Sequence, residues 1–321
     1  MEVGIFRVER KKNEMCVLQR IKDNDFIKKL YDEMRQLYFS GLTLISPEIN
    51  TRARYKSVHG VSLNLENPRN FSEKLLWLKL KDYINNPLVI QCADKYRVRK
   101  YIEDCGCGDI LNELYGVYDS ARDIPWSDLP ESFVLKWNFG AGMNIVVKEK
   151  SRLNVSETVQ KLEKWGKTKY WLPHSEMQYK KTEKKIVCEK FLVDNENPDV
   201  IPDYKVYCFH GEPKAVFVMH DRGNGIKSEF FDTNWSALEN SEKYTKPQQA
   251  TPKPTCFDQM MEVSRKLSSP FPFVRCDYYV VNGKLFFGEL TFTPAGGLYT
   301  STTKIDGKDM SEFLHVPYSN R

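Results

Sequence analysis

Two periods of hydrophobic and polar positions divide the chain. In the first third, apolar residues recur every three or four positions, as in the segment 25–38, where Phe26, Leu30 and Met34 fall on one helical face. From about residue 133 the pattern changes to short apolar runs with a two-residue repeat, which is typical of strands. The pattern therefore predicts a helical start followed by a mixed α+β structure with antiparallel sheets.

Polar pairs spaced three apart predict where two helices begin. Asn70 and Glu73 form a predicted capping box that opens a helix to about residue 83. Asn154 and Glu157 repeat the pattern before a helix that reaches about residue 167. Asp94 is expected to open a further helix, and another is predicted over 256–267.

Short apolar runs predict the strands. They are expected at residues 133–137, 145–148, 186–192, 204–210, 214–220, 227–231, 273–281 and 284–290. The last two are joined at Asn282-Gly283, the strongest short hairpin signal in the chain.

Composition argues against a disordered chain and against a nucleic-acid-binding protein. The 321 residues are 41% hydrophobic and include 18 Phe, 17 Tyr and 6 Trp, enough to fill real cores. The formal charge of +5 arises from 48 basic and 43 acidic residues with both signs interspersed, so no nucleic-acid partner is expected.

The cysteine spacing and the apolar stretches of the chain indicate which cellular compartment to expect. The 8 cysteines show no CxxC pair and no zinc-type Cys/His spacing, and several lie inside apolar runs as small hydrophobes. The first residues contain no apolar leader, and no stretch of about 18 apolar residues occurs, so neither a signal peptide nor a membrane span is predicted. A reducing cytoplasm is the simplest expectation.

Common catalytic motifs do not occur. The chain has no Walker P-loop, no GxGxxG after a strand, no HExxH and no GxSxG. Asp23-Asn24-Asp25 has the DxD shape with which many sugar-nucleotide transferases hold a metal, although the same residues are natural helix caps. A glycosyltransferase is therefore kept as an alternative.

The hairpin at 273–291 carries the most chemistry. Arg275 and Asp277 share one strand face, and Glu289 and Thr291 share a face of the other strand. A two-residue turn would place Asp277 and Glu289 on opposite sides, whereas a three-residue loop with a left-handed glycine bulge would bring all four residues together. Two carboxylates across a ladder repel unless a cation separates them, and magnesium is the hard ion that such a pair would hold.

The motifs together resemble a known family. R-x-D at 275–277, E-x-T at 289–291 and T-P-A-G-G at 293–297 resemble the metal-binding hairpin of ATP-grasp ligases. Upstream, Asp94-Lys95 resembles the first ATP-contacting lysine of that family, and the strand at 134–136 resembles the strand that carries its second lysine. The glycine loop after this strand resembles the loop that covers the phosphates, and Val187 to Leu192 resembles the hinge strand whose backbone reads adenine. With FSEKLLWLKL at 71–80 and Pro202-Asp-Tyr-Lys205, the set is closest to the TupA-like ATP-grasp group over about residues 70–300. That group is associated with bacterial teichuronopeptide and exopolysaccharide biosynthesis.

The resemblance implies an α+β class with the ATP-grasp fold. Two α+β lobes with antiparallel sheets would hold ATP between them, preceded by a short, mostly helical N-terminal region. The expected divisions are 1–92 for the helical region, 93–188 for the small lid lobe with its glycine loop, and 189–321 for the C-terminal lobe with the metal-binding hairpin. The front end is shorter and more helical than the family's usual N-terminal α/β domain.

The resemblance also implies the roles of individual residues. Arg275 would be catalytic and would stabilise charge on the transferring phosphoryl group or tetrahedral intermediate. The metal ligands would be Asp277, Glu289 and Thr291, with Thr291 standing where the family usually has Asn. The ATP-binding residues would be Lys95, Lys136, Gly140, Gly142, Glu189, Lys190, Leu192, Asp203 and Lys205, and the substrate-binding residues Gly296 and Gly297.

Plainer explanations exist for several of these residues. Lys95 at a helix start is equally a surface lysine, and Gly140 and Gly142 equally form an ordinary turn between strands. Arg275 could simply form a salt bridge with Asp277. Lys136 differs, because an unpaired charge inside an apolar strand is costly, and a ligand partner is expected for it.

The implied activity is that of a carboxylate–amine ligase that uses ATP and Mg²⁺ and acts through an acyl phosphate. The expected substrates are a small carboxylate and an amine: an amino acid attached to a uronic-acid-containing surface or capsule polysaccharide or its precursor. Peripheral association with polysaccharide assembly machinery would follow. The alternatives are a phosphotransferase acting on a sugar or glycan, and a non-catalytic nucleotide-binding module.

Overall fold

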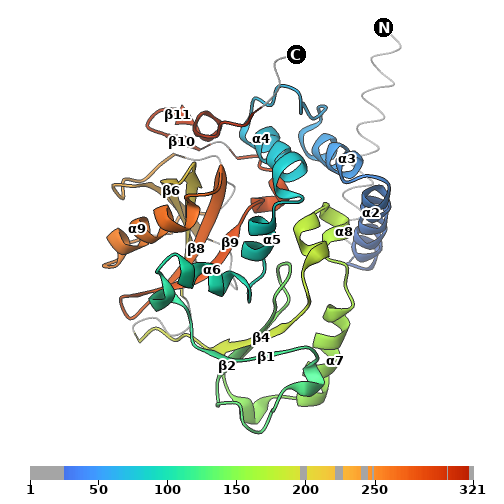
Figure 1. Ribbon diagram of the computed structural model, residues 1–321, viewed down its shortest axis with the longest axis vertical. Coiled ribbons are helices and arrows are strands. Elements are labelled where there is room, and N and C mark those ends of the chain that lie inside the picture. The colour runs from blue at the N-terminus through green and yellow to red at the C-terminus, as the bar shows by residue number, and fades with distance from the viewer. Residues whose placement is uncertain are drawn as a thin grey trace.

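The computed structural model describes residues 25–195, 201–220, 227–239, 245–247, 249–301 and 303–317. These residues form an N-terminal helical region, a four-stranded sheet and a five-stranded sheet (Figure 1). Within the same ranges, no helix combines the length and apolar character needed to cross a membrane.

Residues 25–104 of the helical region contain five α-helices. They are α2 (Asp25–Ile45), α3 (Pro47–His59), α4 (Phe71–Leu78), α5 (Pro87–Ala93) and α6 (Val98–Asp104), and a π-helical turn η1 (Lys79–Tyr83) continues α4. The capping box predicted at Asn70 is confirmed: its side chain accepts from the Glu73 amide at 2.8 Å, and Glu73 accepts from the Asn70 amide at 3.4 Å. α6 begins later than predicted, because the Asp94 carboxylate accepts from the amides of residues 96 and 97 and holds a turn there.

The four-stranded sheet has the order β1-β4-β2-β3 and is antiparallel throughout. Its strands are β1 (Leu114–Tyr118), β2 (Phe133–Trp137), β3 (Asn144–Val147) and β4 (Ile186–Lys190), and α7 (Val155–Gly166) and α8 (Trp171–His174) precede β4. Of these four strands, β1 is the one that the sequence pattern did not predict. The capping box expected at α7 is half formed: Asn154 accepts from the Glu157 amide at 3.1 Å, and no returning bond from Glu157 is present.

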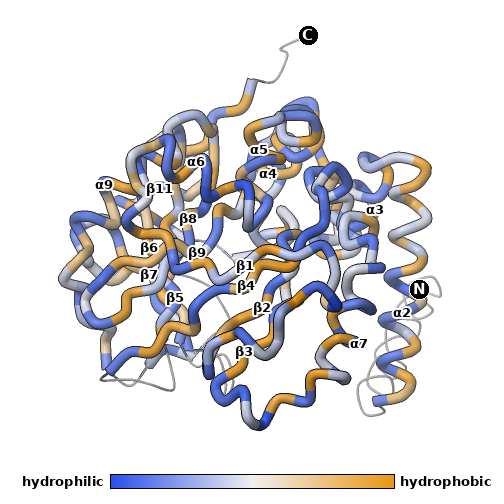
Figure 2. Tube along the Cα trace, turned by 60° about the horizontal axis from the view of Figure 1, so that its bottom comes forward, coloured by the Kyte–Doolittle hydropathy of each residue, from blue (hydrophilic) through white to orange (hydrophobic). Residues whose placement is uncertain are grey.

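The five-stranded sheet has the order β7-β6-β5-β8-β9, also antiparallel. Its strands are β5 (Asp203–Phe209), β6 (Glu212–His220), β7 (Lys227–Asp232), β8 (Phe273–Val281) and β9 (Lys284–Thr291), with α9 (Phe257–Ser268) packed on β5, β6 and β8. α4 contributes Phe71, whose ring lies 5.3 Å from that of Phe273. Figure 2 shows hydrophobic residues along these strands, which bury the largest core of the molecule.

Short elements complete the chain. They are the 3₁₀ segments η2 (Gly108–Ile110), η3 (Ala121–Asp123), η4 (Lys150–Arg152), η5 (Met177–Lys181), η6 (Pro294–Gly297) and η7 (Met310–Phe313), and the strand pair β10 (Lys304–Ile305) and β11 (Lys308–Asp309). The predicted division after residue 188 falls inside β4, and the three-part division stays a prediction.

Candidate functional site

The β8–β9 hairpin combines features of both predicted registers. Its turn has two residues, Asn282 and Gly283, both with positive φ (50° and 74°), as in a type I′ turn. Farther from the turn, a bulge shifts the register between Asp277 and Tyr278, so that Asp277 faces Glu289. The two carboxylates therefore face each other, as in the second of the two arrangements considered, but the turn has the two residues of the first, and the bulge produces the shift.

Gly288 is the residue that makes this bulge possible. It lies between Phe287, which pairs with Tyr278, and Glu289, which pairs with Asp277. A Cβ atom on Gly288 would lie 2.9 Å from the carbonyl oxygen of Asp277, a distance that side chains do not tolerate. A glycine at this position is thus required to bring the two carboxylates onto one face.

Asp277 is buried and held by two cations. Arg275 Nε donates to Asp277 Oδ1 at 2.7 Å, and Arg275 Nη2 donates to Oδ2 at 2.6 Å. Lys205 Nζ donates to Oδ2 at 2.9 Å, and Asp203 lies 3.7 Å from the same ammonium. Burial opposes the ionisation of Asp277, but the charges of Arg275 and Lys205 outweigh it and lower the pKa of this carboxyl.

Glu289 is the more accessible carboxylate. Its side chain is 40% exposed, against 4% for Asp277. Thr291 Oγ1 donates to Glu289 Oε1 at 3.2 Å and accepts from Arg275 Nη2 at 3.1 Å. Arg275 therefore lies between the two carboxylates and supplies the cation that the opposed pair requires, in addition to the salt bridge considered above.

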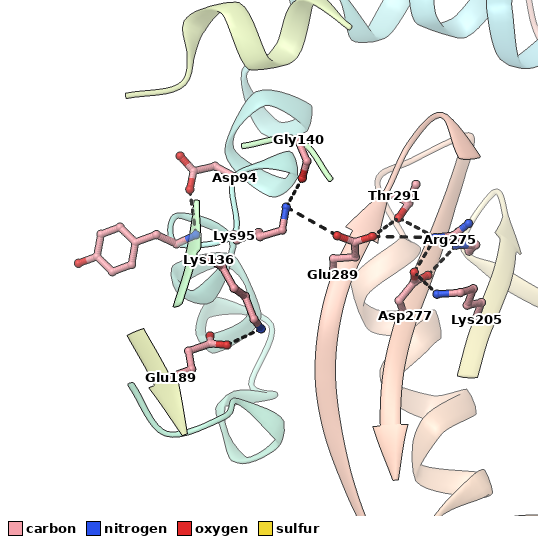
Figure 3. A network of polar contacts seen from close by, with 11 residues as sticks. Asp94, Lys95, Lys136, Gly140, Glu189, Lys205, Arg275, Asp277, Glu289 and Thr291 are labelled. Atoms are coloured by element: carbon pink, nitrogen blue, oxygen red, sulfur yellow. Dashed lines mark hydrogen bonds and ion pairs between the residues drawn. The ribbon is translucent and has the colours of Figure 1, made fainter. Parts of the chain in front are cut away.

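Lys95 connects the glycine loop to this hairpin. Its Nζ donates to the Gly140 carbonyl and lies 3.8 Å from Glu289 Oε2, so this lysine, in the turn between α5 and α6, bridges the β2–β3 loop and β9 (Figure 3). Burial lowers the pKa of Lys95, with Glu289 opposing the shift. Residues far apart in sequence thus meet at one place.

Lys136 has a partner within the protein. Its Nζ donates to Glu189 Oε2 at 2.7 Å, from β2 to β4. The charge of Lys136 is thus not left unpaired without a ligand, as the sequence argument assumed, and its role in ATP binding stays a prediction. Arg99, which the sequence analysis missed, lies 3.4 Å from Glu189 Oε1. Its position four residues after Lys95, one helical turn away, was the available signal.

The loop between β2 and β3 contains the two predicted phosphate-loop glycines. Gly140 and Gly142 have φ of 68° and 76°, the left-handed region that glycine adopts without strain. A Cβ on Gly140 would lie 2.6 Å from the Tyr170 ring, whereas Gly142 has open space around it. The loop therefore packs tightly on one side and leaves its other side open.

Most of the predicted residues meet at a cavity between the two sheets. It has a volume of about 140 Å³ and is lined, among others, by Lys95, Lys136, Gly140, Gly142, Glu189, Asp203, Lys205, Asp277 and Glu289. A second cavity of about 420 Å³ shares Leu111 and Asn112 with the first and contains Lys190 and Leu192 in its wall. The predicted nucleotide residues are thus divided between two adjoining cavities.

Other predicted residues lie outside both cavities. Arg275 and Thr291 contact the carboxylates but line neither cavity. The carbonyl of Gly296 accepts from Lys79 Nζ at 3.5 Å, and that of Gly297 accepts from Ser72 Oγ at 2.5 Å. Of the DxD tripeptide, residues 23 and 24 lie outside the described residues, and Asp25 begins α2.

Asp277 and Glu289 fit a magnesium ion whose remaining ligands are phosphate oxygens. No group of three or more His, Cys, Asp or Glu side chains in the described part of the chain is arranged to hold a metal alone. Asp277 and Glu289 supply two carboxylates, but three cations, Lys95, Lys205 and Arg275, lie within 4.0 Å of them. A bare cation would lie close to these three positive groups, whereas a metal bound to phosphate oxygens would be compensated.

The chain matches a known protein family. A family model described as "TupA-like ATPgrasp" matches residues 73–311. A D-alanine–D-alanine ligase from Bacillus anthracis has a TM-score of 0.40 and 15% identity over 63% of this chain and 57% of that chain. The enzyme of the same name from Helicobacter pylori has a TM-score of 0.38 and 18% identity over 65% and 56%.

A third solved structure is the ADP complex of N5-carboxyaminoimidazole ribonucleotide synthetase, with a TM-score of 0.41 and 14% identity over 68% of this chain and 49% of that chain. The chain thus spans little more than half the length of the two D-alanine–D-alanine ligases that it matches. No match was found among curated proteins.

Proposed function

The chain belongs to the TupA-like ATP-grasp family, and on that premise we propose that it is an ATP-dependent carboxylate–amine ligase. The observation that carries the proposal is the cavity between the sheets. Three lysines, Lys95, Lys136 and Lys205, line it together with the carboxylates of Asp277 and Glu289. Such a mixture of fixed cations and two opposed carboxylates complements a polyphosphate with its metal ion.

In this proposal the triphosphate lies beside Lys95 and Lys136 in the cavity between the sheets. Lys95 and Lys136 neutralise phosphate charge, and the amides of the loop containing Gly140 and Gly142 approach the phosphate oxygens. The base lies in the adjoining cavity, whose wall includes Phe191 and Leu192, and the backbone of these two residues would read adenine. Asn112 lines both cavities, so the proposed phosphate and base regions adjoin at this residue.

Glu289 and Asp277 would hold magnesium together with phosphate oxygens and water. Glu289 is accessible as it stands, whereas Asp277 becomes available as Lys205, which lines the cavity, turns toward the phosphates. Thr291 orients Glu289 through its hydroxyl. When bound, the ion would supply charge stabilisation for the phosphates.

The proposed reaction needs no nucleophilic side chain. The carboxylate of one substrate attacks the γ-phosphate, which forms an acyl phosphate and releases ADP. An amine then attacks the acyl carbon and displaces inorganic phosphate, giving the amide. Arg275, fixed by its two bonds to Asp277, directs a permanent positive charge to where negative charge develops.

For the substrates, we propose an amino acid as the amine and a uronic-acid-containing surface polysaccharide or its precursor as the carboxylate. The support is the association of the TupA-like group with such polymers. A cytoplasmic enzyme acting on a precursor, next to the polysaccharide assembly machinery, fits this proposal.

The test is ADP release from ATP and Mg²⁺ in the presence of uronic-acid oligosaccharides and each amino acid in turn. Release that requires both substrates, and that Asp277→Ala and Glu289→Ala abolish, supports the ligase. A stable phosphorylated sugar formed without any amine would instead identify a phosphotransferase. Binding of a nucleotide sugar in place of ATP would favour a glycosyltransferase.

A further inference from the structure

Helix α8 is attached to the N-terminal helices through its last carbonyl groups. The C-terminal carbonyls of a helix lack partners within the helix. Here the carbonyl of residue 172 accepts from Thr43 Oγ1 at 2.6 Å, that of residue 173 from Arg54 Nη1 at 3.1 Å, and that of residue 174 from Lys79 Nζ. Side chains from α2, α3 and η1 thus fix the position of His174. Figure 1 shows α8 beside α2.

This attachment continues to the loop that follows the β8–β9 hairpin. Lys79 Nζ, which holds the carbonyl of His174, also lies 3.5 Å from the Gly296 carbonyl. A Cβ atom on Gly296 would lie 3.6 Å from His174 Nδ1, so the imidazole lies beside this loop. Thr293, two residues after Thr291 of β9, donates to Glu176 Oε1 at 2.9 Å. The N-terminal helices therefore contact the loop that directly follows the hairpin carrying the carboxylates.

Positive charges gather at this border. The guanidinium groups of Arg35 and Arg54 both lie over the ring of Phe39, with their central carbons 5.5 Å and 4.7 Å from its centroid. In the described ranges, no carboxylate lies within ion-pair distance of either arginine. Both guanidinium groups are thus held against one aromatic ring, and among the described residues no carboxylate forms an ion pair with either of them.

The ionisation of neighbouring groups reflects this excess. Burial lowers the pKa of His174 to about 4, and the charges of Arg54, Lys79 and Arg35 contribute to the shift. Burial lowers the pKa of Arg54 as well, and Arg35 adds to it. Glu176, the carboxyl that opposes the shift at Arg54, is itself buried, and its pKa is raised by that burial.

We propose that Arg35, Arg54 and His174 form a subsite for an anionic group of the acceptor substrate. The inference rests on the proposed function in that it assigns the site to the acceptor rather than to the nucleotide. None of the three residues lines the cavities assigned to the nucleotide. The guanidinium fork matches the oxygens of a carboxylate or a phosphate, and stacking on Phe39 holds both forks before the ligand arrives.

The subsite gives the N-terminal helices a function. They would bind a charged part of the acceptor while a separate carboxylate of the same molecule reaches the hairpin past Gly296. A carboxylate-rich oligosaccharide and a phosphorylated sugar share the chemistry that this site recognises, so the experiment compares the two.

The test is direct binding to the full chain, measured by isothermal titration calorimetry without ATP. The probes are trigalacturonate for carboxylates, glucose 1-phosphate for phosphate and maltotriose as the neutral control. The variants are Arg35→Gln and Arg54→Gln, with Lys56→Gln as the matched control, because Lys56 is an exposed cation on the same helix as Arg54. Arg35 is also exposed, so its replacement leaves the fold intact even if Arg54→Gln weakens the attachment of α8.

We expect one of the two anionic probes to bind the native chain, and each arginine variant to bind it at least about tenfold more weakly. Lys56→Gln should bind like the native chain, and maltotriose should not bind. Equal affinity in native and Arg35→Gln chains, or no binding of either anionic probe, would overturn the subsite. Because this readout needs no turnover, an absence of ADP release with arginine-dependent binding would count against the ligase activity alone.

Discussion

Asp277 and Glu289 lie directly opposite each other on β8 and β9, with the Arg275 guanidinium 2.6 Å from the first carboxylate and 4.0 Å from the second. The two acids differ in their surroundings. Asp277 is buried between Arg275 and Lys205, whereas Glu289 opens to the cavity. One acid is thus bound within the protein and the other is available to a ligand.

The first prediction concerns the bulge that aligns these residues. Gly288→Ala would place a Cβ 2.9 Å from the Asp277 carbonyl oxygen, so the strands must move apart or the register must change. We expect a loss of about 1–3 kcal/mol in the free energy of unfolding, as for other overpacked sites. ATP affinity should fall as well, because the carboxylates no longer face each other. Urea denaturation and nucleotide titration measure the two effects.

Gly108→Ala is the matched control for this change. A Cβ there would meet Glu103 at 3.6 Å, an ordinary contact, and the residue has no positive φ. It should leave both the stability and the ATP affinity close to native. A Gly288→Ala chain that behaves like Gly108→Ala would show that the bulge does not require glycine.

The second prediction separates the two carboxylates. Asp277→Asn leaves Arg275 and Lys205 buried without their counterion, and should cost roughly 3–5 kcal/mol of stability. Glu289→Gln removes a half-exposed charge and should hardly change stability, while it raises the Mg²⁺ concentration needed for half-maximal ATP binding at least about tenfold. Denaturation curves and Mg²⁺ titrations of both variants decide this. Equal loss of stability in the two variants would contradict the assignment.

The third prediction uses the buried Lys79. Burial lowers its pKa from 10.5 to about 8, so between these pH values the unfolded chain binds a proton that the native chain does not. The free energy of unfolding should therefore rise with pH in this window, by about 3 kcal/mol from this group. In Lys79→Met this contribution is absent, and the stability difference between native and variant chains should grow in favour of the native chain from pH 8 to 10.5. A difference independent of pH would refute it.

The fourth prediction compares two lysines near β4. Lys136 lines the cavity on the same side as the glycine loop, whereas Lys190 is exposed and pairs with Glu113 at 3.1 Å. Lys136→Met should weaken ATP binding about tenfold or more, because a fixed cation beside the phosphates is lost. Lys190→Met removes a cation of the same kind outside the phosphate region and should change the affinity little. A fluorescent ATP analogue provides the measurement for both variants.

Much of the fold and part of the candidate site follow from local sequence patterns. The Asn70–Glu73 box, the alternation in residues 133–137 and the hairpin turn at Asn282-Gly283 each predicted an element that the structure contains. These signals are reliable because they depend on contacts within a few residues or on the side-chain repeat of a single strand. The same reasoning located Arg275, Asp277 and Glu289 on one hairpin.

What the tertiary structure decided depends on contacts between distant segments. The Gly288 bulge, the pairing of Lys136 with Glu189 and the attachment of α8 to Thr43, Arg54 and Lys79 have no local period that would predict them. A single-residue shift in strand register reverses which side chains face each other, and whether a buried charge has a partner depends on which strand lies beside it. The sequence by itself determined which groups were available, and packing determined which of them meet.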